Sequence, residues 1–213
     1  MKKILLISFL IISLVTLTTI ASKTFYITNS KLNSISTKYG TSAKSRVELW
    51  DNMLQTSKDK KILNKLKNVN DFFNKIPYKT DSKHWKKEDY WATPYEFMGT
   101  AAGDCEDYAI AKYFSLRKIG VPDSKLRITY VKYKRTRSKF EQAHMVLTYY
   151  HKPGATPIVL DNINKKLKLA TKRKDLKPIY SFNAGGLWQA KNKGSVRVGT
   201  NNLRSWKDLM SRI

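Results

Sequence analysis

Apolar residues between positions 44 and 76 recur at intervals of three and four, which is the spacing of one helical face. The positions are Val47, Trp50, Leu54, Ile62, Leu66, Val69, Phe73 and Ile76. We expect two helices here, with a break near residues 56–58 and with Pro77 ending the second. Residues 22–43 are rich in Ser, Thr, Asn and Lys, so we expect an extended lead-in before one domain at 44–213.

A second apolar stripe predicts a central helix from about Cys105 to Gly120, with Pro122 just beyond it. The aromatic stretch between Pro77 and Gly99 is irregular and indicates a loop. After the central helix, β-branched and aromatic residues indicate strands. We expect strands at 126–133, 143–150, 157–160 and 178–182, a turn at Gly185-Gly186 and a short C-terminal helix around Trp206. Helices followed by an antiparallel sheet define an α+β fold.

The N-terminus has the pattern of an export signal. Lys2 and Lys3 precede an uncharged, mostly apolar run over residues 4–21, and Ala21 ends it with a small residue. We expect residues 1–21 to be a signal peptide that is removed after Ala21. The alternative is an uncleaved membrane anchor, although Ser and Thr dilute the second half of the run.

The chain is strongly basic, with 41 Lys and Arg against 16 Asp and Glu and a net charge of +25. Most of the basic residues are Lys, and they are spread from Lys23 to Lys207. A nucleic-acid-binding protein more often concentrates Arg in one patch, so we expect no nucleic-acid partner. An acidic partner fits the charge. A basic, exported binding module for anionic polymers remains an alternative.

The single cysteine, Cys105, cannot form an internal disulfide and stands at the start of the predicted central helix. The positive end of the helix dipole favours a thiolate there, and the free N–H groups of the first turn can stabilise an oxyanion. Asp104, Glu106 and Asp107 oppose thiolate formation. A bound cation would resolve this conflict; alternatively, Asp104 and Asp107 act only as helix caps.

A cysteine nucleophile needs a base and a group that orients the base. His144 lies within a predicted strand, whereas His84 lies in the aromatic loop and His151 beside a turn. Asp161 ends the next predicted strand. If the strand of His144 packs on the central helix, His144 can face Cys105 and Asp161 can accept the imidazole N–H. The three residues then form a Cys-His-Asp triad.

The sequence resembles the bacterial transglutaminase-like cysteine proteinases, the LapG family, over about residues 47–188. The resemblance rests on the segments YWATPYEF (90–97), GDCEDYAIAKY (103–113), LRI (126–128), AHMVL (143–147) and VLDN (159–162). It implies a papain-like fold with Cys105 as nucleophile, His144 as general base and Asp161 as orienting acid. It also implies Ca²⁺ near the active site, held by Asp104 and Glu106, with Asp107 as a further ligand.

The resemblance further implies a periplasmic endopeptidase that acts in biofilm release. Its implied substrate is the N-terminal region of a large, calcium-binding surface adhesin, cut at a di-alanine site. Its implied inhibitor is an inner-membrane receptor that senses cyclic-di-GMP. A protein-glutamine acyl transferase would use the same triad, so the sequence leaves this alternative open.

Overall fold

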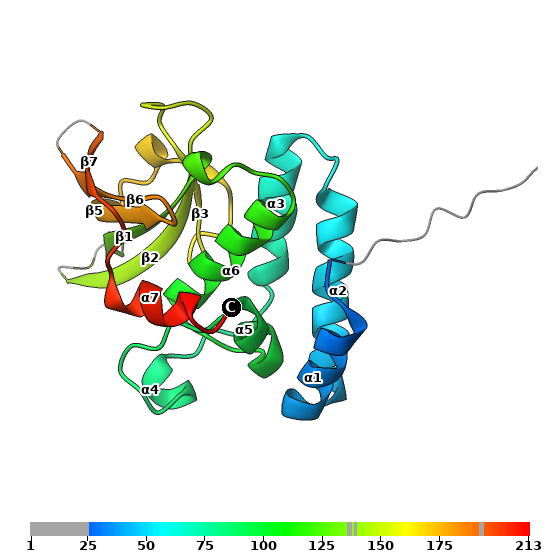
Figure 1. Cartoon of the computed structure of the whole chain (residues 1–213). Helices are drawn as coiled ribbons and strands as arrows, with labels where there is room; N and C mark the ends of the chain where they lie inside the picture. The colour runs from blue at the N-terminus through cyan, green and yellow to red at the C-terminus, as the bar shows by residue number, and fades with distance from the viewer. Residues whose placement is uncertain (1–25, 136–137, 139, 192–193) are drawn as a thin grey trace, which may run out of the picture.

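The computed structural model describes residues 26–135, 138, 140–191 and 194–213. A helical layer comes first along the chain and a seven-stranded sheet follows (Figure 1). The α-helices are α1 (Asn29–Tyr39), α2 (Thr41–Ser57), α3 (Ile62–Phe73), α4 (Asp81–His84), α5 (Pro94–Thr100), α6 (Cys105–Lys118) and α7 (Arg204–Met210). Two 3₁₀ helices span Asp123–Lys125 (η1) and Ala170–Lys172 (η2). The strands are β1 (Leu126–Lys134), β2 (Glu141–Tyr149), β3 (Ile158–Leu160), β4 (Lys168–Leu169), β5 (Leu176–Asn183), β6 (Gly186–Ala190) and β7 (Ser195–Gly199).

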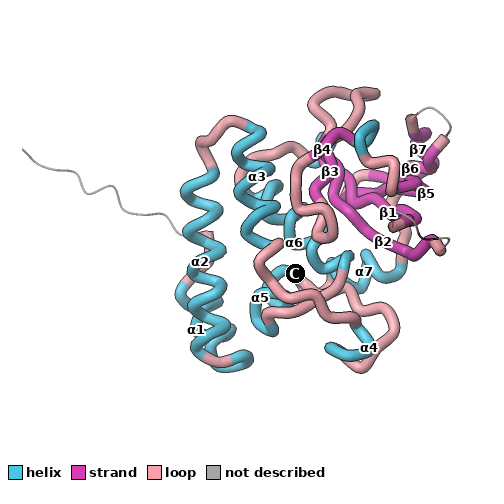
Figure 2. The backbone as a smooth tube through the Cα atoms, turned by 180° about the vertical axis from the view of Figure 1, so that it is seen from behind, coloured by secondary structure: helices cyan, strands magenta, loops and turns pink. Residues whose placement is uncertain are grey.

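The sheet is antiparallel throughout and has the order β4-β3-β2-β1-β5-β6-β7. Helix α6 lies between the sheet and helices α3 and α5, since it packs on β2 and β1 and also on α3 and α5 (Figure 2). Ten of its fourteen residues are buried, so this helix forms the centre of the core. The expected α+β fold with N-terminal helices and an antiparallel sheet is confirmed.

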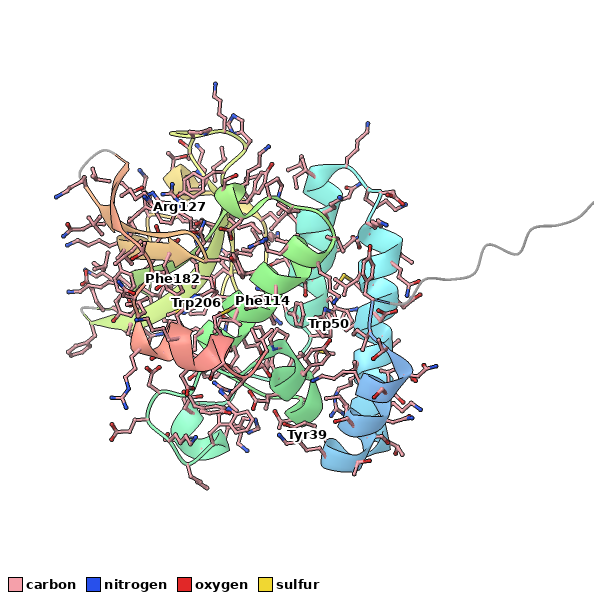
Figure 3. The ribbon with its side chains drawn as sticks, viewed as in Figure 1. Tyr39, Trp50, Phe114, Arg127, Phe182 and Trp206 are labelled. Carbon is pink, nitrogen blue, oxygen red and sulfur yellow. The ribbon has the colours of Figure 1, made fainter. Side chains whose placement is uncertain are left out.

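Aromatic side chains hold the outer helices to this centre (Figure 3). Trp50 of α2 donates its indole N–H to Ser115 of α6 at 2.8 Å. On the other side, Trp206 of α7 stacks on Phe114 and meets Phe182 of the sheet edge to face. Helices α2 and α7 are therefore both fixed to α6.

The extended lead-in that we expected at residues 22–43 is wrong, because α1 and the start of α2 occupy most of it. Thr28 caps α1, and Leu32 and Ile35 are buried against the core. The Ser, Asn and Lys composition has weak helix propensity, so the helix depends on this packing. The domain therefore begins before residue 44.

The expected loop between Pro77 and Gly99 contains two short helices, α4 and most of α5, and is corrected accordingly. Helix α5 begins with a capping box, in which Thr93 and Glu96 bond each other's backbone N–H, and with Pro94 at its first position. This cap was visible in the sequence as Thr-Pro-x-Glu.

The other predicted helices and strands are confirmed. The two helices of 44–76 are α2 and α3, the central helix is α6 and the C-terminal helix is α7. The four expected strands are β1, β2, β3 and β5. The turn expected at Gly185-Gly186 lies one residue earlier, at Ala184-Gly185, because Gly186 begins β6 and pairs with Asn183. Strands β4, β6 and β7 were not predicted. The predicted signal peptide at 1–21 lies outside the described residues; among those described, no helix has the length and apolar character to cross a membrane.

Candidate active site

Cys105 is the first residue of α6, and the loop before it is tightly fixed. The carboxylate of Asp107 accepts the backbone N–H of Ala92 at 2.8 Å and that of Asp104 at 3.2 Å. A Cβ on Gly103 would overlap Asp107 Oδ2 and lie 2.8 Å from Cδ2 of Phe97. Only glycine fits between these groups, so the close packing positions the thiol.

His144 and Asp161 form a buried hydrogen bond, with His144 Nε2 2.8 Å from Asp161 Oδ1. His144 lies in β2, and Asp161 follows the last residue of β3. The β2–β3 register pairs Leu147 with Leu160, which places Asp161 on the side toward His144. The expected pairing of these two residues is therefore present in the structure.

Arg173 was not predicted, yet it contacts the same carboxylate. Its Nη2 donates to Asp161 Oδ2 at 2.7 Å, and Ile163 N donates to Oδ1 at 3.0 Å. Burial raises the pKa of Asp161, but the hydrogen bond and charge of His144, the Ile163 N–H and the charge of Arg173 together hold it well below its ordinary value. Asp161 is thus a fixed anion.

Cys105 and His144, the predicted nucleophile and base, both line one hollow. Its other lining residues are Asp89, Trp91, Glu106, Tyr130, Ala143, Met145 and Tyr180. The Cys105 thiol donates to Glu106 Oε2 at 3.1 Å. Burial raises the pKa of this thiol, the Glu106 and Asp104 carboxylates raise it further, and the Met145 backbone N–H acts in the opposite direction. The carboxylates therefore oppose thiolate formation, as expected.

The remaining histidines lie elsewhere. His84, in α4, is within 2.8 Å of the Thr100 hydroxyl. His151 is exposed in the turn after β2. Neither lines the hollow that contains Cys105.

Acidic side chains gather beside the thiol. Two of them, Asp81 and Asp89, were not predicted from the sequence. The ligand atoms of Asp81, Asp104 and Asp107 lie within 4.8 Å of one another, and so do those of Asp81, Asp89 and Glu106. Burial raises the pKa of Asp104 to about 8, of Glu106 to about 7 and of Asp81 to about 6. Carboxylates crowded in this way repel each other unless a cation joins them.

This cluster fits a calcium ion. Asp104 Oδ1 and Asp81 Oδ1 are buried and have no hydrogen-bond partner among the described residues. Carboxylate oxygens are the ligands that Ca²⁺ prefers. Asp107, by contrast, uses both oxygens to accept backbone N–H groups. Asp104, Glu106, Asp81 and Asp89 could hold the ion, whereas the expected metal role of Asp107 stays a prediction.

The chain matches the model of the bacterial transglutaminase-like cysteine proteinases over residues 37–178. It belongs to this family, and the protein is a cysteine protease.

Solved structures of LapG from Legionella pneumophila are similar to this chain. The EGTA-treated form has a TM-score of 0.76 at 40% identity, covering 89% of this chain and 99% of LapG. The calcium-bound form has a TM-score of 0.74 at 41% identity, covering 86% and 97%. A comparison with curated proteins finds no match.

Proposed function

We propose that this protein is an exported, calcium-dependent endopeptidase with Cys105 as nucleophile, His144 as general base and Asp161 as orienting acid. The observation that carries the proposal is the buried His144–Asp161 hydrogen bond of 2.8 Å, whose histidine lines one hollow with Cys105. A thiol nucleophile requires a base that a third group holds in place, and the His144–Asp161 pair supports this role for His144.

In the proposed reaction, His144 takes the proton of the Cys105 thiol as the sulfur attacks the carbonyl carbon of the peptide bond. His144 then gives that proton to the leaving amine, and water hydrolyses the thioester. Asp161 holds the imidazole through Nε2 and stabilises its positive charge. The backbone N–H of Cys105, at the first position of α6, can donate to the oxyanion, whereas that of Asp107 is bonded to the Asp104 side chain in a capping box.

Calcium belongs to this proposal because the chain's own carboxylates oppose the thiolate. Asp104 and Glu106 flank Cys105 and raise the pKa of its thiol. When bound, Ca²⁺ would supply two positive charges beside the sulfur. Asp104 and Glu106 are the proposed main ligands, with Asp81 and Asp89 completing the oxygen set. The calcium-bound form of LapG from Legionella pneumophila supports calcium as the metal.

The proposed substrate is the N-terminal region of a large, calcium-binding surface adhesin, cut at a di-alanine site. The proposed location is the periplasm, with residues 1–21 removed, and the proposed inhibitor is an inner-membrane receptor for cyclic-di-GMP. Family membership supports a protease that acts on a protein substrate; the adhesin and the receptor are what the resemblance of the sequence implies. The basic, apolar N-terminus supports export.

The test is to incubate protein starting at Ser22 with the N-terminal fragment of an adhesin encoded nearby, in calcium and in EGTA. We expect cleavage at the di-alanine site in calcium and its loss in EGTA. A labelled amine in the same reaction tests the acyl-transferase alternative. Amine incorporation without peptide cleavage would contradict the proposal, and so would equal cleavage after verified removal of calcium.

A further inference from the structure

The connection between β3 and β5 gathers positive charge in one place. Residues 162–174 include five lysines and one arginine and no acidic residue. All five lysines line one hollow of about 680 Å³, together with Tyr133, Ile163, Asn164 and Asp175. We call this hollow the lysine basin; its lysines are Lys165, Lys166, Lys168, Lys172 and Lys174.

Most of this charge is uncompensated. Lys166, Lys168, Lys172 and Lys174 make no ion pair with any residue that the structure describes, and Lys165 donates to the backbone carbonyl of Asn74 at 2.9 Å. The only acid in the lining, Asp175, has both carboxylate oxygens bonded by Arg173. The basin therefore presents a concentrated positive field to solvent.

The basin adjoins the proposed catalytic groups. Tyr133 lines it, and the Tyr133 ring lies 5.8 Å from the ring of His144. Ile163, another lining residue, donates its N–H to Asp161. Arg173 joins Asp161 to Asp175 on the basin wall. Tyr133 and Ile163 thus join the basin to the His144–Asp161 pair.

We propose that the lysine basin binds an acidic stretch of the polypeptide substrate while the scissile bond lies at Cys105. This inference rests on the proposed function and locates a second contact for the same substrate. Extended chain advances about 3.3 Å per residue, so a few acidic residues are enough to reach several lysines.

The chemistry of the basin favours a polypeptide over a nucleic acid. Its accessible cations are lysines, whose mobile point charges suit scattered carboxylates, while Arg173 is 2% exposed and already engaged. Single-stranded nucleic acids are bound by aromatic platforms on which bases stack. Tyr133 is the only aromatic residue of the basin and faces His144.

The test uses two labelled peptides with the same di-alanine centre, one flanked on both sides by Asp and Glu and the other by Asn and Gln. Their binding to Cys105→Ala protein is measured by fluorescence anisotropy in calcium. We expect the acidic peptide to bind about tenfold more tightly at low salt and to lose this advantage at high salt. Lys166→Gln/Lys172→Gln/Lys174→Gln should abolish most of the advantage.

The matched control is Lys58→Gln/Lys60→Gln/Lys61→Gln, which removes the same charge from exposed lysines of the α2–α3 connection. These lysines line neither hollow, so the control should keep the preference. The proposal would be overturned if the wild-type surface bound the two peptides with equal affinity. It would also be overturned if both triple variants lost the preference for the acidic peptide to the same extent. Binding of an oligonucleotide that needs Lys166, Lys172 and Lys174, without acidic-peptide binding, would also overturn it.

Cleavage of the two peptides separates this inference from the proposed function. In otherwise wild-type protein, the ratio of kcat/KM for the acidic over the amide peptide should fall toward one in the basin variant. If wild-type protein cleaves neither peptide, the endopeptidase proposal fails, and anisotropy still decides whether the basin binds an acidic chain. If both peptides are cleaved equally well, the endopeptidase stands and the basin proposal falls.

Discussion

Arg173 and Asp161 form a buried ion pair on the side of the carboxylate that His144 leaves free. Arg173 Nη2 lies 2.7 Å from Asp161 Oδ2, and His144 Nε2 lies 2.8 Å from Oδ1. Both side chains of the ion pair are almost fully excluded from solvent. The arginine therefore fixes the plane of the carboxylate and, through it, the orientation of the histidine.

We predict that Arg173→Met lowers kcat far more than it changes KM. The variant should also lose about 3–5 kcal/mol of stability, because it leaves the Asp161 charge buried without its cation. Arg173→Lys keeps the charge and should recover part of both. Steady-state kinetics and urea unfolding measure the two effects. A normal kcat in folded Arg173→Met protein would show that the arginine does not position the triad.

Asp161→Asn should retain some activity, because an orienting group contributes less than the nucleophile and its loss leaves the oxyanion donors in place. Burial opposes the Asp161 anion, but His144 and Arg173 stabilise it, so its pKa is lowered in the folded state. The stability that it contributes at neutral pH should therefore be lost as pH falls below about 4. Unfolding curves from pH 7 to 3 test this, since the asparagine variant should lose less stability on acidification.

Gly103→Ala should reduce both stability and activity. The added Cβ would overlap Asp107 Oδ2 and crowd Phe97, so the loop that carries Cys105 must shift. Overpacking of this kind costs about 1–3 kcal/mol. Gly185→Ala is the matched control, since its Cβ would be 3.5 Å from the nearest neighbouring atom, Asp123 Oδ2. Thermal melting and cleavage assays that show no difference between the two variants would contradict the prediction.

Lys112, which is buried in α6, should make the free energy of unfolding depend on pH in the alkaline range. Burial lowers its pKa to about 7, although the charges of Asp161 and Asp71 act in the opposite direction and Lys165 lowers it further. Between pH 7 and about 10, the folded state binds fewer protons than the unfolded state, so the lysine contributes more stability as pH rises.

Lys112→Met should remove this dependence. The advantage of wild type over the variant in unfolding free energy should grow by up to about 4 kcal/mol from pH 7 to 10. The lost hydrogen bond from Lys112 Nζ to Asn74 Oδ1 adds a cost that does not change with pH. Urea titrations at three pH values measure the slope. A constant difference would mean that Lys112 keeps one protonation state in the folded protein.

Calcium removal should suppress activity and lower the melting temperature together, and calcium should restore both better than magnesium. Asp104→Ala and Glu106→Ala should behave like the chelated protein. A residue that acts only as a helix cap would cost about 0.5–2 kcal/mol and leave activity insensitive to EGTA. Activity and melting curves of each variant, with and without calcium, distinguish the two roles.

The sequence predicted Cys105, His144 and Asp161, because the residues next to each of them in the chain indicate its role. Cys105 stands at a helix start within Gly-Asp-Cys-Glu-Asp, and His144 and Asp161 stand on neighbouring strands. The sequence did not predict what surrounds His144. Val146, on the same side of β2, packs in a small cluster with Val131 and Val159, whereas Met145 joins the main core with α6.

Arg173, Asp81 and Asp89 could not be found from sequence because their roles depend on contacts between distant segments. Arg173 lies between two lysines and looks like part of a solvated charge run. Only the fold shows that it points inward to Asp161 while its neighbours line a hollow. The lysines of the basin also looked dispersed in the sequence, because only the fold shows that they line one hollow.

The most direct test of the central claim is intact-mass analysis of an adhesin fragment after incubation in calcium with wild-type, Cys105→Ala or His144→Ala protein. Wild type should give two products whose masses sum to the substrate plus one water, which is the signature of hydrolysis. Both variants should leave the substrate intact while their circular dichroism spectra stay native. Cleavage by folded Cys105→Ala protein at the wild-type rate would contradict a cysteine endopeptidase centred on Cys105.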